Sequence, residues 1–368
     1  MLILEERQIK ISNIEVGVVA TRPGQMYAWP GIVRINENEI LVAASERRYH
    51  VCPYGREVVI RSEDNGKSWE LPREVYNSQL DDRDANLCIT PDGTLILSWF
   101  TSTAFDKFWS NEAERVTDKM RTELLGTWLC HSTDGGENWG KALRMPAGVH
   151  IAPSVLSDSS LICIGSPSQS EEALNVYKSN DMGLSWRKVY QFECKKIWVE
   201  EAERYMLEFD ENHVFELSPG KLTVMFRTEP AGDGYLYQAF SDDNGETWSK
   251  PSNTGIWGFP PQLMRLSDGT IMCSYSHRKT PYSIRVVFSH DNGRSWDIDN
   301  IATLYEWKDK PDMGYPSSIE LSPNKILTVF YCSRCDADGK SPTSWNKNIS
   351  ADSSPEGILS ITFTLEKY

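Results

Sequence analysis

Basic side chains close several similar apolar segments, where they could bind one anion. Arg47 and Arg48 follow the run ILVAASE, Arg227 closes KLTVMF, and His277 and Arg278 follow IMCSYS. The planar guanidinium of arginine can form two parallel hydrogen bonds with a carboxylate, and it keeps its charge at neutral pH. Three separate segments therefore present guanidinium groups that could converge on an anionic ligand.

Acidic and phenolic side chains open three alternating runs, each of which precedes an apolar segment of this kind. Alignment of the segments on their turns gives equivalent positions to Trp29, Asp84, Glu211, Pro260 and Tyr315, with His150 or Pro153 nearest in the shorter third segment. Packing alone does not explain two carboxylates and a phenol at matching positions. A carboxylate at an inner strand end is costly unless it is solvated or paired. These openings are therefore candidates for one shared polar pocket.

Each opening residue begins an alternating strand, which is followed by a turn rich in Gly, Asp or Asn and then by an apolar strand. Six segments repeat this order, beginning at Trp29, Asp84, Ala152, Glu211, Pro260 and Tyr315. The order is typical of a β-hairpin. In a propeller the innermost strands converge on the axis, so the first residues of six such hairpins would face one cavity.

A second repeat, Ser-x-Asp-x-Gly-x-x-Trp, lies between the hairpins. Its five copies begin at Ser62, Ser132, Ser179, Ser241 and Ser289. The Asp can bond the amides of its own turn, the Gly tolerates a positive φ, and the Trp can pack the turn onto its neighbours. We therefore interpret these Asp residues as structural and not as a calcium or sugar site.

A hairpin, a further strand and this turn make the four strands of a propeller blade. The chain is thus predicted to be all-β, a six-bladed β-propeller of four-stranded antiparallel blades forming a single domain over residues 1–368. The sixth hairpin lacks the turn motif; GILSITFTL near the C-terminus and QIKISNIEVGVVA near the N-terminus can supply its third and fourth strands, which removes an exposed edge. Residues 105–127 break the rhythm and suit a helical or loop insertion over one mouth of the ring.

The five Asp-box turns and the runs DENHVFELSPGKLTVMFR and GYPSSIELSPNKILTVFY resemble the sialidase (neuraminidase) superfamily over nearly the whole chain. That resemblance implies a Tyr nucleophile at Tyr315, a Glu base at Glu211 that draws the phenolic proton, and a carboxylate-binding arginine at Arg227. A phenol with a pKa near 10 is a poor nucleophile at neutral pH, and a carboxylate beside it raises its reactivity.

Two family positions differ in this chain. The family's Phe-Arg-x-Pro opening is Tyr27-Ala28-Trp29-Pro30 here, and the loop RRYHVCPYGR lacks the expected acid/base Asp. Arg48 or Arg22 could supply the missing cation. The run Asp81-Asp82-Arg83-Asp84 could supply the acid, and strand register favours Asp84.

The remaining triad position could be filled by Arg278 or by Arg285, with Arg278 slightly preferred because Arg285 lies inside a strand-like run. Trp29 and Trp99 could stack on a sugar face. Other candidates for substrate contact are Asp82, Arg83, Gln262, His50 and His277.

The net charge of the chain limits the classes of partner that it can bind. Lys and Arg number 38 against 52 Asp and Glu, a formal net charge of −14, which argues against nucleic acids or anionic surfaces as partners. The chain as written shows no secretory signal and no membrane span, so we expect a cytoplasmic protein, or a secreted or periplasmic one if a leader was removed. No cofactor is expected, and no metal, although Cys332 and Cys335 form a lone C-x-x-C.

Three functions follow from these patterns. The first is an exo-sialidase-like glycoside hydrolase acting on a glycan or small acidic sugar. The second is a hydrolase or lyase acting on another acidic glycan such as a uronate. The third is a carbohydrate-binding propeller without catalysis, although binding alone does not need a base beside a phenol.

Overall fold

The computed structural model describes residues 9–166, 172–199, 204–228, 232–307, 312–333 and 357–367. Six four-stranded antiparallel sheets form the blades of a propeller, as predicted from the repeats. Blade 1 contains β2 (Met26–Arg34), β3 (Ile40–Arg47), β4 (Arg56–Ser62) and β5 (Arg73–Tyr76). Blade 2 contains β6 (Asp81–Ile89), β7 (Leu95–Ser102), β8 (Gly126–Ser132) and β9 (Leu143–Arg144). Blade 3 contains β10 (Ser154–Val155), β11 (Leu161–Gly165), β12 (Ala173–Ser179) and β13 (Arg187–Glu193).

The second half of the ring repeats this order. Blade 4 contains β16 (Phe209–Ser218), β17 (Lys221–Thr228), β18 (Tyr235–Ser241) and β19 (Ser252–Trp257). Blade 5 contains β20 (Phe259–Arg265), β21 (Ile271–His277), β22 (Tyr282–Ser289) and β23 (Ala302–Trp307). Blade 6 contains β24 (Asp312–Ser322), β25 (Lys325–Ser333), β26 (Gly357–Lys367) and β1 (Ile9–Ala20). The hairpin β14 (Lys196–Val199) and β15 (Arg204–Leu207) stands between blades 3 and 4.

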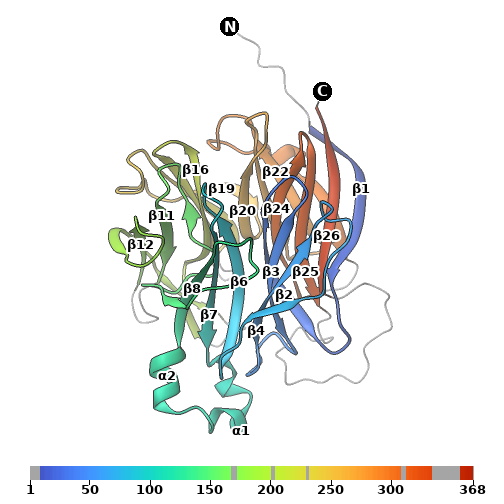
Figure 1. Ribbon diagram of the computed structural model, residues 1–368. Helices are drawn as coiled ribbons and strands as arrows, with labels where there is room; N and C mark the ends of the chain where they lie inside the picture. The colour runs from blue at the N-terminus through green and yellow to red at the C-terminus, as the bar shows by residue number, and fades with distance from the viewer. Residues whose placement is uncertain are drawn as a thin grey trace.

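Blade 6 joins the two ends of the described chain. β26 lies between β25 and β1, and β1 pairs antiparallel with β26 from Ile9 opposite Lys367 to Ala20 opposite Ile358. The two strands run side by side at the right of Figure 1, with the start of β1 and the end of β26 near the top of that view.

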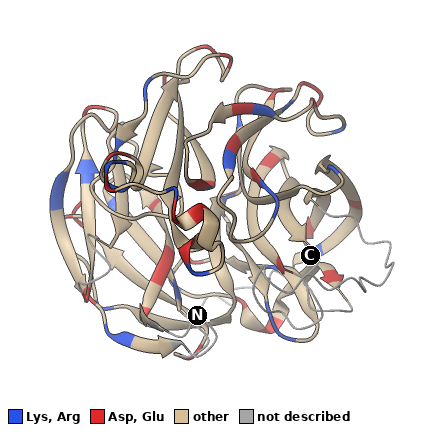
Figure 2. Cartoon of the chain, turned by 90° about the horizontal axis from the view of Figure 1, so that it is seen from below, with Lys and Arg blue, Asp and Glu red and all other residues tan. Residues whose placement is uncertain are grey.

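Short helices interrupt blade 2, within the predicted insertion. They are η1 (Ala104–Lys107), α1 (Ser110–Ala113) and α2 (Asp118–Leu124), and a further short helix, η3 (Ile298–Asn300), precedes β23. The insertion follows the end of β7, where Ser102 pairs with Asp81 at the start of β6. The helices therefore project from the end of the ring where first strands begin, at the bottom of Figure 1 and toward the viewer in Figure 2. No helix among the described residues is long and apolar enough to cross a membrane.

The Asp-box turns stabilise the hairpins through short-range hydrogen bonds. In the first box the N–H of Ser68 donates to Asp64 at 2.8 Å, and the N–H of Gly66 donates to the hydroxyl of Ser62 at 2.8 Å. Gly66 has a φ of +81°, and a Cβ there would lie 2.9 Å from the side chain of Leu327 in blade 6. The turn thus needs glycine both for its backbone and for contact with the neighbouring blade, which supports the structural interpretation of the boxes.

The Trp of each box packs into the layer between blades. Trp248 is 7% exposed, contacts the apolar cluster shared by blades 3 and 4, and donates its ring N–H to the Gly245 carbonyl at 3.0 Å. Replacing Trp248 with alanine should lower the free energy of unfolding by about 3–5 kcal/mol, measured by urea denaturation, because the cavity cannot fully collapse. The matched control is Trp198→Ala, since that side chain is 46% exposed. Equal losses in both variants would contradict the packing role.

Candidate active site

Three first strands contain a backbone irregularity at the same place. Trp29, Asp84 and Tyr315 have φ angles of +53°, +60° and +53°. Each falls where the register of its hairpin shifts. The shift lies between Ala28 and Gly31 for Trp29, between Arg83 and Asn86 for Asp84, and between Gly314 and Ser317 for Tyr315. Bulky residues rarely adopt this left-handed conformation, and a bulge re-aims the side chain that carries it. Repeated strain at equivalent positions of three blades is typical of a functional site.

Tyr315 and Glu211 come from blades 6 and 4 and form a direct hydrogen bond. The phenol of Tyr315 donates to Oε1 of Glu211, and Nη1 of Arg227 donates to Oε2 of Glu211 at 2.5 Å. Nη1 of Arg227 also lies 3.5 Å from the phenolic oxygen. The predicted trio is therefore assembled, with the carboxylate held between the phenol and the guanidinium.

Charge and burial give these two groups different protonation states. Burial alone would raise the pKa of Glu211, but the positive charges of Arg227 and His150 and the hydrogen bond from Tyr315 lower it to about 2. Burial and the negative charge of Glu211 raise the pKa of Tyr315 well above 10. At neutral pH the pair thus consists of a neutral phenol and an ionised carboxylate, which can take its proton.

A second guanidinium, that of Arg278, lies near the Tyr315 ring. Arg278 is 5.8 Å from the Tyr315 ring centre, and both Arg278 and Arg227 lie over the ring of Phe259, at 5.9 and 5.3 Å. Arg278 donates to the Met313 carbonyl at 3.0 Å, while its buried Nε has no hydrogen-bond partner among the described residues. Two guanidinium groups around one aromatic ring form a site suited to an anion.

A histidine and two carboxylates adjoin this centre. Nδ1 of His150 lies 3.0 Å from Oδ2 of Asp84, and Nε2 lies 3.6 Å from Oδ1 of Asp210. Burial alone would lower the pKa of His150, but Asp210 and Asp84 raise it to about 9. The second oxygen of Asp84 is buried, and no described residue hydrogen-bonds to it.

Trp29 anchors the first-blade side of the site. The guanidinium groups of Arg47 and Arg83 lie 4.8 and 4.7 Å from its ring centre, and Arg47 forms an ion pair with Asp81 at 2.6 Å. The Trp29 ring also lies edge-on to Tyr315, with centres 6.4 Å apart. Trp29 is only 2% exposed, so it packs against the two arginines and the phenol. The prediction that it stacks on a sugar face is therefore wrong.

His50 lies beside Trp29 and is held by Asp312. Nδ1 of His50 is 2.7 Å from Oδ2 of Asp312, and the hydroxyl of Tyr331 donates to Oδ1 at 2.7 Å. The ring centres of His50 and Trp29 are 5.2 Å apart, and the His50 side chain is 47% exposed. His50 thus combines a fixed orientation with access to solvent at the edge of the site.

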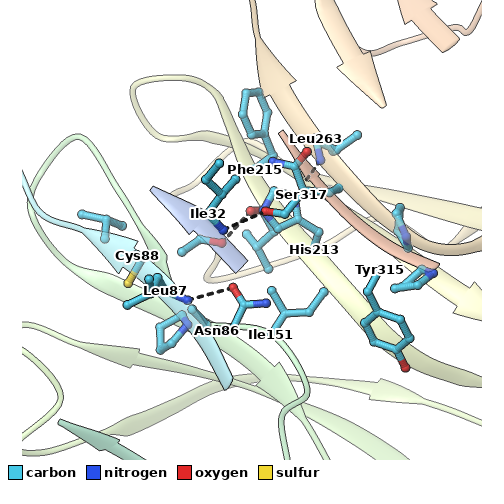
Figure 3. Close-up of a pocket in the computed structure, with 18 of the residues that line it drawn as sticks. Ile32, Asn86, Leu87, Cys88, Ile151, His213, Phe215, Leu263, Tyr315 and Ser317 are labelled. Atoms are coloured by element: carbon cyan, nitrogen blue, oxygen red, sulfur yellow. Dashed lines mark hydrogen bonds between the residues drawn. The ribbon is translucent and has the colours of Figure 1, made fainter. Parts of the chain in front are cut away.

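A central cavity of about 500 Å³ adjoins this cluster along the ring axis. Its lining comes from the first hairpin of all six blades: Ile32, Asn86, Ser154, His213, Leu263 and Tyr315 are examples. In Figure 3 Tyr315 stands at the margin of the labelled residues, with its hydroxyl directed away from Ile32 and Leu263. The hairpins therefore share a central space as predicted. Tyr315 connects this space with the polar cluster, which consists of Tyr315, Glu211, Arg227, Arg278, His150, Asp84 and Asp210.

Residues 55–326 match the family described as a BNR repeat-like domain. The chain belongs to this family. A protein of unknown function from Dyadobacter fermentans has a similar fold, with 20% identity, a TM-score of 0.76, and coverage of 98% of this chain and 100% of that one. No protein of known, curated function matches the sequence closely enough to extend this assignment.

Sialidase structures share the same architecture. The NanB sialidase from Streptococcus pneumoniae has 15% identity and a TM-score of 0.63, and the match covers 95% of this chain and 70% of that one. The intramolecular trans-sialidase from Ruminococcus gnavus has 15% identity and a TM-score of 0.58, with coverage of 92% and 94%. These similarities establish a sialidase-like fold for this BNR repeat-like chain.

Several predicted contact residues lie outside the polar cluster of this BNR repeat-like propeller. Asp82 is fully buried and accepts hydrogen bonds from Ser78 and Thr101, and burial raises its pKa to about 7. Arg48 is exposed and lines a different cavity, of about 700 Å³, beside the helical insertion. Arg22, the other replacement considered for the missing cation, is 64% exposed beside Glu46.

Three further candidates form hydrogen bonds within blade 5. Gln262 lines the axial cavity, where its carbonyl accepts from Ser274. Nε of Arg285 donates to Ser283 at 2.9 Å, and Nδ1 of His277 lies 3.1 Å from the Pro281 carbonyl. Of the two arginines that competed for the triad position, the structure brings Arg278 to the phenol. In blade 2, Trp99 is 1% exposed and packs on Tyr76 in the core, so it cannot stack on a sugar.

The structure also adds residues that the sequence did not single out. Asp210 directly precedes Glu211, and Asp312 stands three residues before Tyr315 at the start of the same strand. Proximity in sequence to the predicted pair was the available signal for both. Among the described residues no cluster of His, Cys, Asp or Glu could hold a metal ion, and Cys335 of the C-x-x-C pair lies outside those residues.

Proposed function

We propose that this chain is a glycoside hydrolase that removes a terminal carboxylated sugar, with sialic acid as the first candidate. The observation that carries the proposal is the Tyr315 phenol hydrogen-bonded to the ionised Glu211, with the guanidinium groups of Arg227 and Arg278 close to it. A binding protein has no need of a proton acceptor on a phenol. A nucleophile does, because its oxygen must lose its proton as it attacks.

The arrangement suggests how the reaction would proceed. Arg227 and Arg278 would bind the sugar carboxylate and place the anomeric carbon at the Tyr315 oxygen. Tyr315 would attack as its proton moves to Glu211, and the glycosidic bond to the leaving group would break. The neutral phenol avoids repulsion with the sugar carboxylate before attack, which suits a tyrosine better than a carboxylate nucleophile at this site.

The first test compares three fluorogenic substrates: an α-sialoside, its methyl ester and a β-glucuronide. Hydrolysis of the sialoside but not of the ester would support recognition of the carboxylate. Absence of turnover on the sialoside and the glucuronide, with the sugars still bound, would instead indicate a carbohydrate-binding protein.

Removal of one guanidinium should weaken substrate binding. Arg278→Met keeps much of the side-chain length without the charge, so KM for the carboxylated sugar should rise about tenfold to a hundredfold, the loss of about 1.5–3 kcal/mol expected for a charged hydrogen bond. The preference for the free acid over its methyl ester should fall in parallel. Arg285→Met is the matched control from the same blade. A variant Arg278→Met with an unchanged KM would refute the anion-binding role.

One observation favours a second candidate substrate, an acidic glycan such as a uronate. At the opening of the first hairpin stands a buried Trp29, and the guanidinium groups near it belong to Arg47 and Arg83. The cation arrangement on this side therefore differs from that expected of a sialidase. Faster hydrolysis of the glucuronide than of the sialoside would select this candidate.

A further inference from the structure

His150 is clamped between carboxylates from two different blades. Asp84 of β6 holds its Nδ1 at 3.0 Å, and Asp210 of β16 lies 3.6 Å from its Nε2. The ring of Phe100 meets the imidazole edge-on with centres 5.0 Å apart. One nitrogen is thus fixed by a hydrogen bond, and the other has a longer contact that a ligand atom could replace.

The imidazole is more accessible than its carboxylate partner. The His150 side chain is 31% exposed, whereas Asp84 is 5% exposed and one of its oxygens is occupied by Nδ1 of His150. An incoming glycosidic oxygen can therefore reach the imidazole more easily than either oxygen of Asp84. The accessible member of the pair is the one placed to exchange a proton with substrate.

The charges around the ring keep it protonated. Three acidic groups face His150, namely Asp84 from β6 and Asp210 and Glu211 from β16. Although burial opposes the charge, these groups raise the pKa of His150 to about 9. At neutral pH the imidazole of His150 is accordingly protonated on both nitrogens.

We infer that His150, and not Asp84, is the general acid that protonates the leaving group, and that Asp84 is its positioning residue. The inference rests on the proposed function. As the Tyr315 oxygen bonds to the anomeric carbon, its own proton passes to Glu211. The bond from that carbon to the leaving oxygen breaks, and the leaving oxygen takes the proton of Nε2 of His150.

The second half of the reaction restores every group. A water molecule attacks the anomeric carbon and gives its proton to the neutral His150. The bond between that carbon and the Tyr315 oxygen breaks, and the phenolate recovers its proton from Glu211. No oxidant, reductant or metal enters either step.

The variant His150→Asn tests this role because its amide can still donate to Asp84 but has no counterpart of Nε2. Two sialosides are compared, one with an alkyl alcohol as leaving group and one with a nitrophenol. We expect kcat/KM for the alkyl substrate to fall about 10²–10⁴-fold, the usual contribution of a general acid. The nitrophenyl substrate should lose about tenfold or less, because its anion departs without a proton. His277→Asn is the matched control.

The pH profile gives an independent measurement. Wild-type kcat/KM on the alkyl substrate should decrease as pH rises through about 9, where His150 loses its proton. That decrease should be absent in His150→Asn and should move to lower pH in Asp84→Asn, where the imidazole keeps a neighbour but loses a negative charge. If His150 had a purely structural role, neither variant would change the pH at which kcat/KM decreases, that is, the alkaline limb of the profile.

The outcomes separate the two proposals. Equal losses on both substrates in His150→Asn, or an unchanged alkaline limb, would overturn the assignment of His150 while leaving the hydrolase intact. A wild-type protein without turnover on these sialosides and on the corresponding glucuronides would overturn the proposed function itself, and the inference with it.

Discussion

Replacement of Tyr315 by phenylalanine is expected to reduce kcat toward the preferred carboxylated sugar by about a thousandfold or more. The change deletes the nucleophilic oxygen but leaves Glu211, Arg227 and the ring packing in place. Rates of fluorophore release would measure the loss. In the wild type, a slow fluorinated substrate should leave a covalent sugar on Tyr315, detectable by mass spectrometry of the peptide.

Tyr237→Phe is the matched control, because that phenol also donates to a carboxylate, Asp233, at 2.8 Å but lies outside the polar cluster. It should retain wild-type kcat. If Tyr315→Phe hydrolysed the sugar at more than about a tenth of the wild-type rate, tyrosine could not be the nucleophile.

Replacement of Glu211 by glutamine should lower kcat about 10²–10⁴-fold, because the amide cannot accept the phenolic proton. The same change leaves the largely buried Arg227 without its carboxylate, and we expect the free energy of unfolding to fall by about 3 kcal/mol. Steady-state rates and urea denaturation, measured on the same preparation, distinguish the catalytic loss from unfolding.

The control for Glu211 is Glu216→Gln on the same strand, whose carboxylate accepts from Ser157 and Gly220 at the far turn. Because the pKa of Glu211 is about 2, its ion pair with Arg227 stabilises the fold above the unfolded pKa near 4.5 and is lost only as pH falls toward 2. Wild-type activity should therefore show no inflection from Glu211 between about pH 4 and 8. An inflection there that vanished in Glu211→Gln would disprove the assigned charge state.

The pairing of Glu211 with Tyr315 was predictable because it depends on register. Both residues open a first strand, and alignment of the turns was enough to place them at one end of the axis. The six repeated hairpins predicted the number of blades, whereas the turn motif occurs only five times. Arg227 followed from the same reasoning, since the end of each second strand lies opposite the start of its first strand; Asp210 pairs with Arg227 in the structure.

Parity along a strand explains the misplaced residues. Consecutive side chains point to opposite faces, so Arg47 reaches Trp29 while Arg48 faces the insertion. In the same way, Asp82 points to the opposite face from its sequence neighbours Asp81 and Arg83. Its carboxylate accepts from Ser78 and Thr101 in the interior. The bulges at Trp29, Asp84 and Tyr315, where the backbone is left-handed, also alter this alternation. No local residue pattern predicts these bulges.

The surroundings of the nucleophile could not be read from residue types alone. His150 precedes the shortest first strand, two residues long, so alignment left its position open. His50 and Asp312 come from blades 1 and 6, and only ring closure makes them neighbours. Contacts between equivalent positions of the repeats follow from their register, whereas contacts made by the segments that connect the repeated strands require the fold itself.

The joint between β1 and β26 has a mechanical consequence. Because Ile9 lies opposite Lys367, a pulling force on the two chain ends would load the ladder one residue pair at a time and peel the strands apart instead of shearing them. The outermost strand, β1, would detach first, while the packing of β2 on β24 and β25 would still hold blades 1 and 6 together. Tethering at these ends should thus remove β1 before the remaining blades lose their packing.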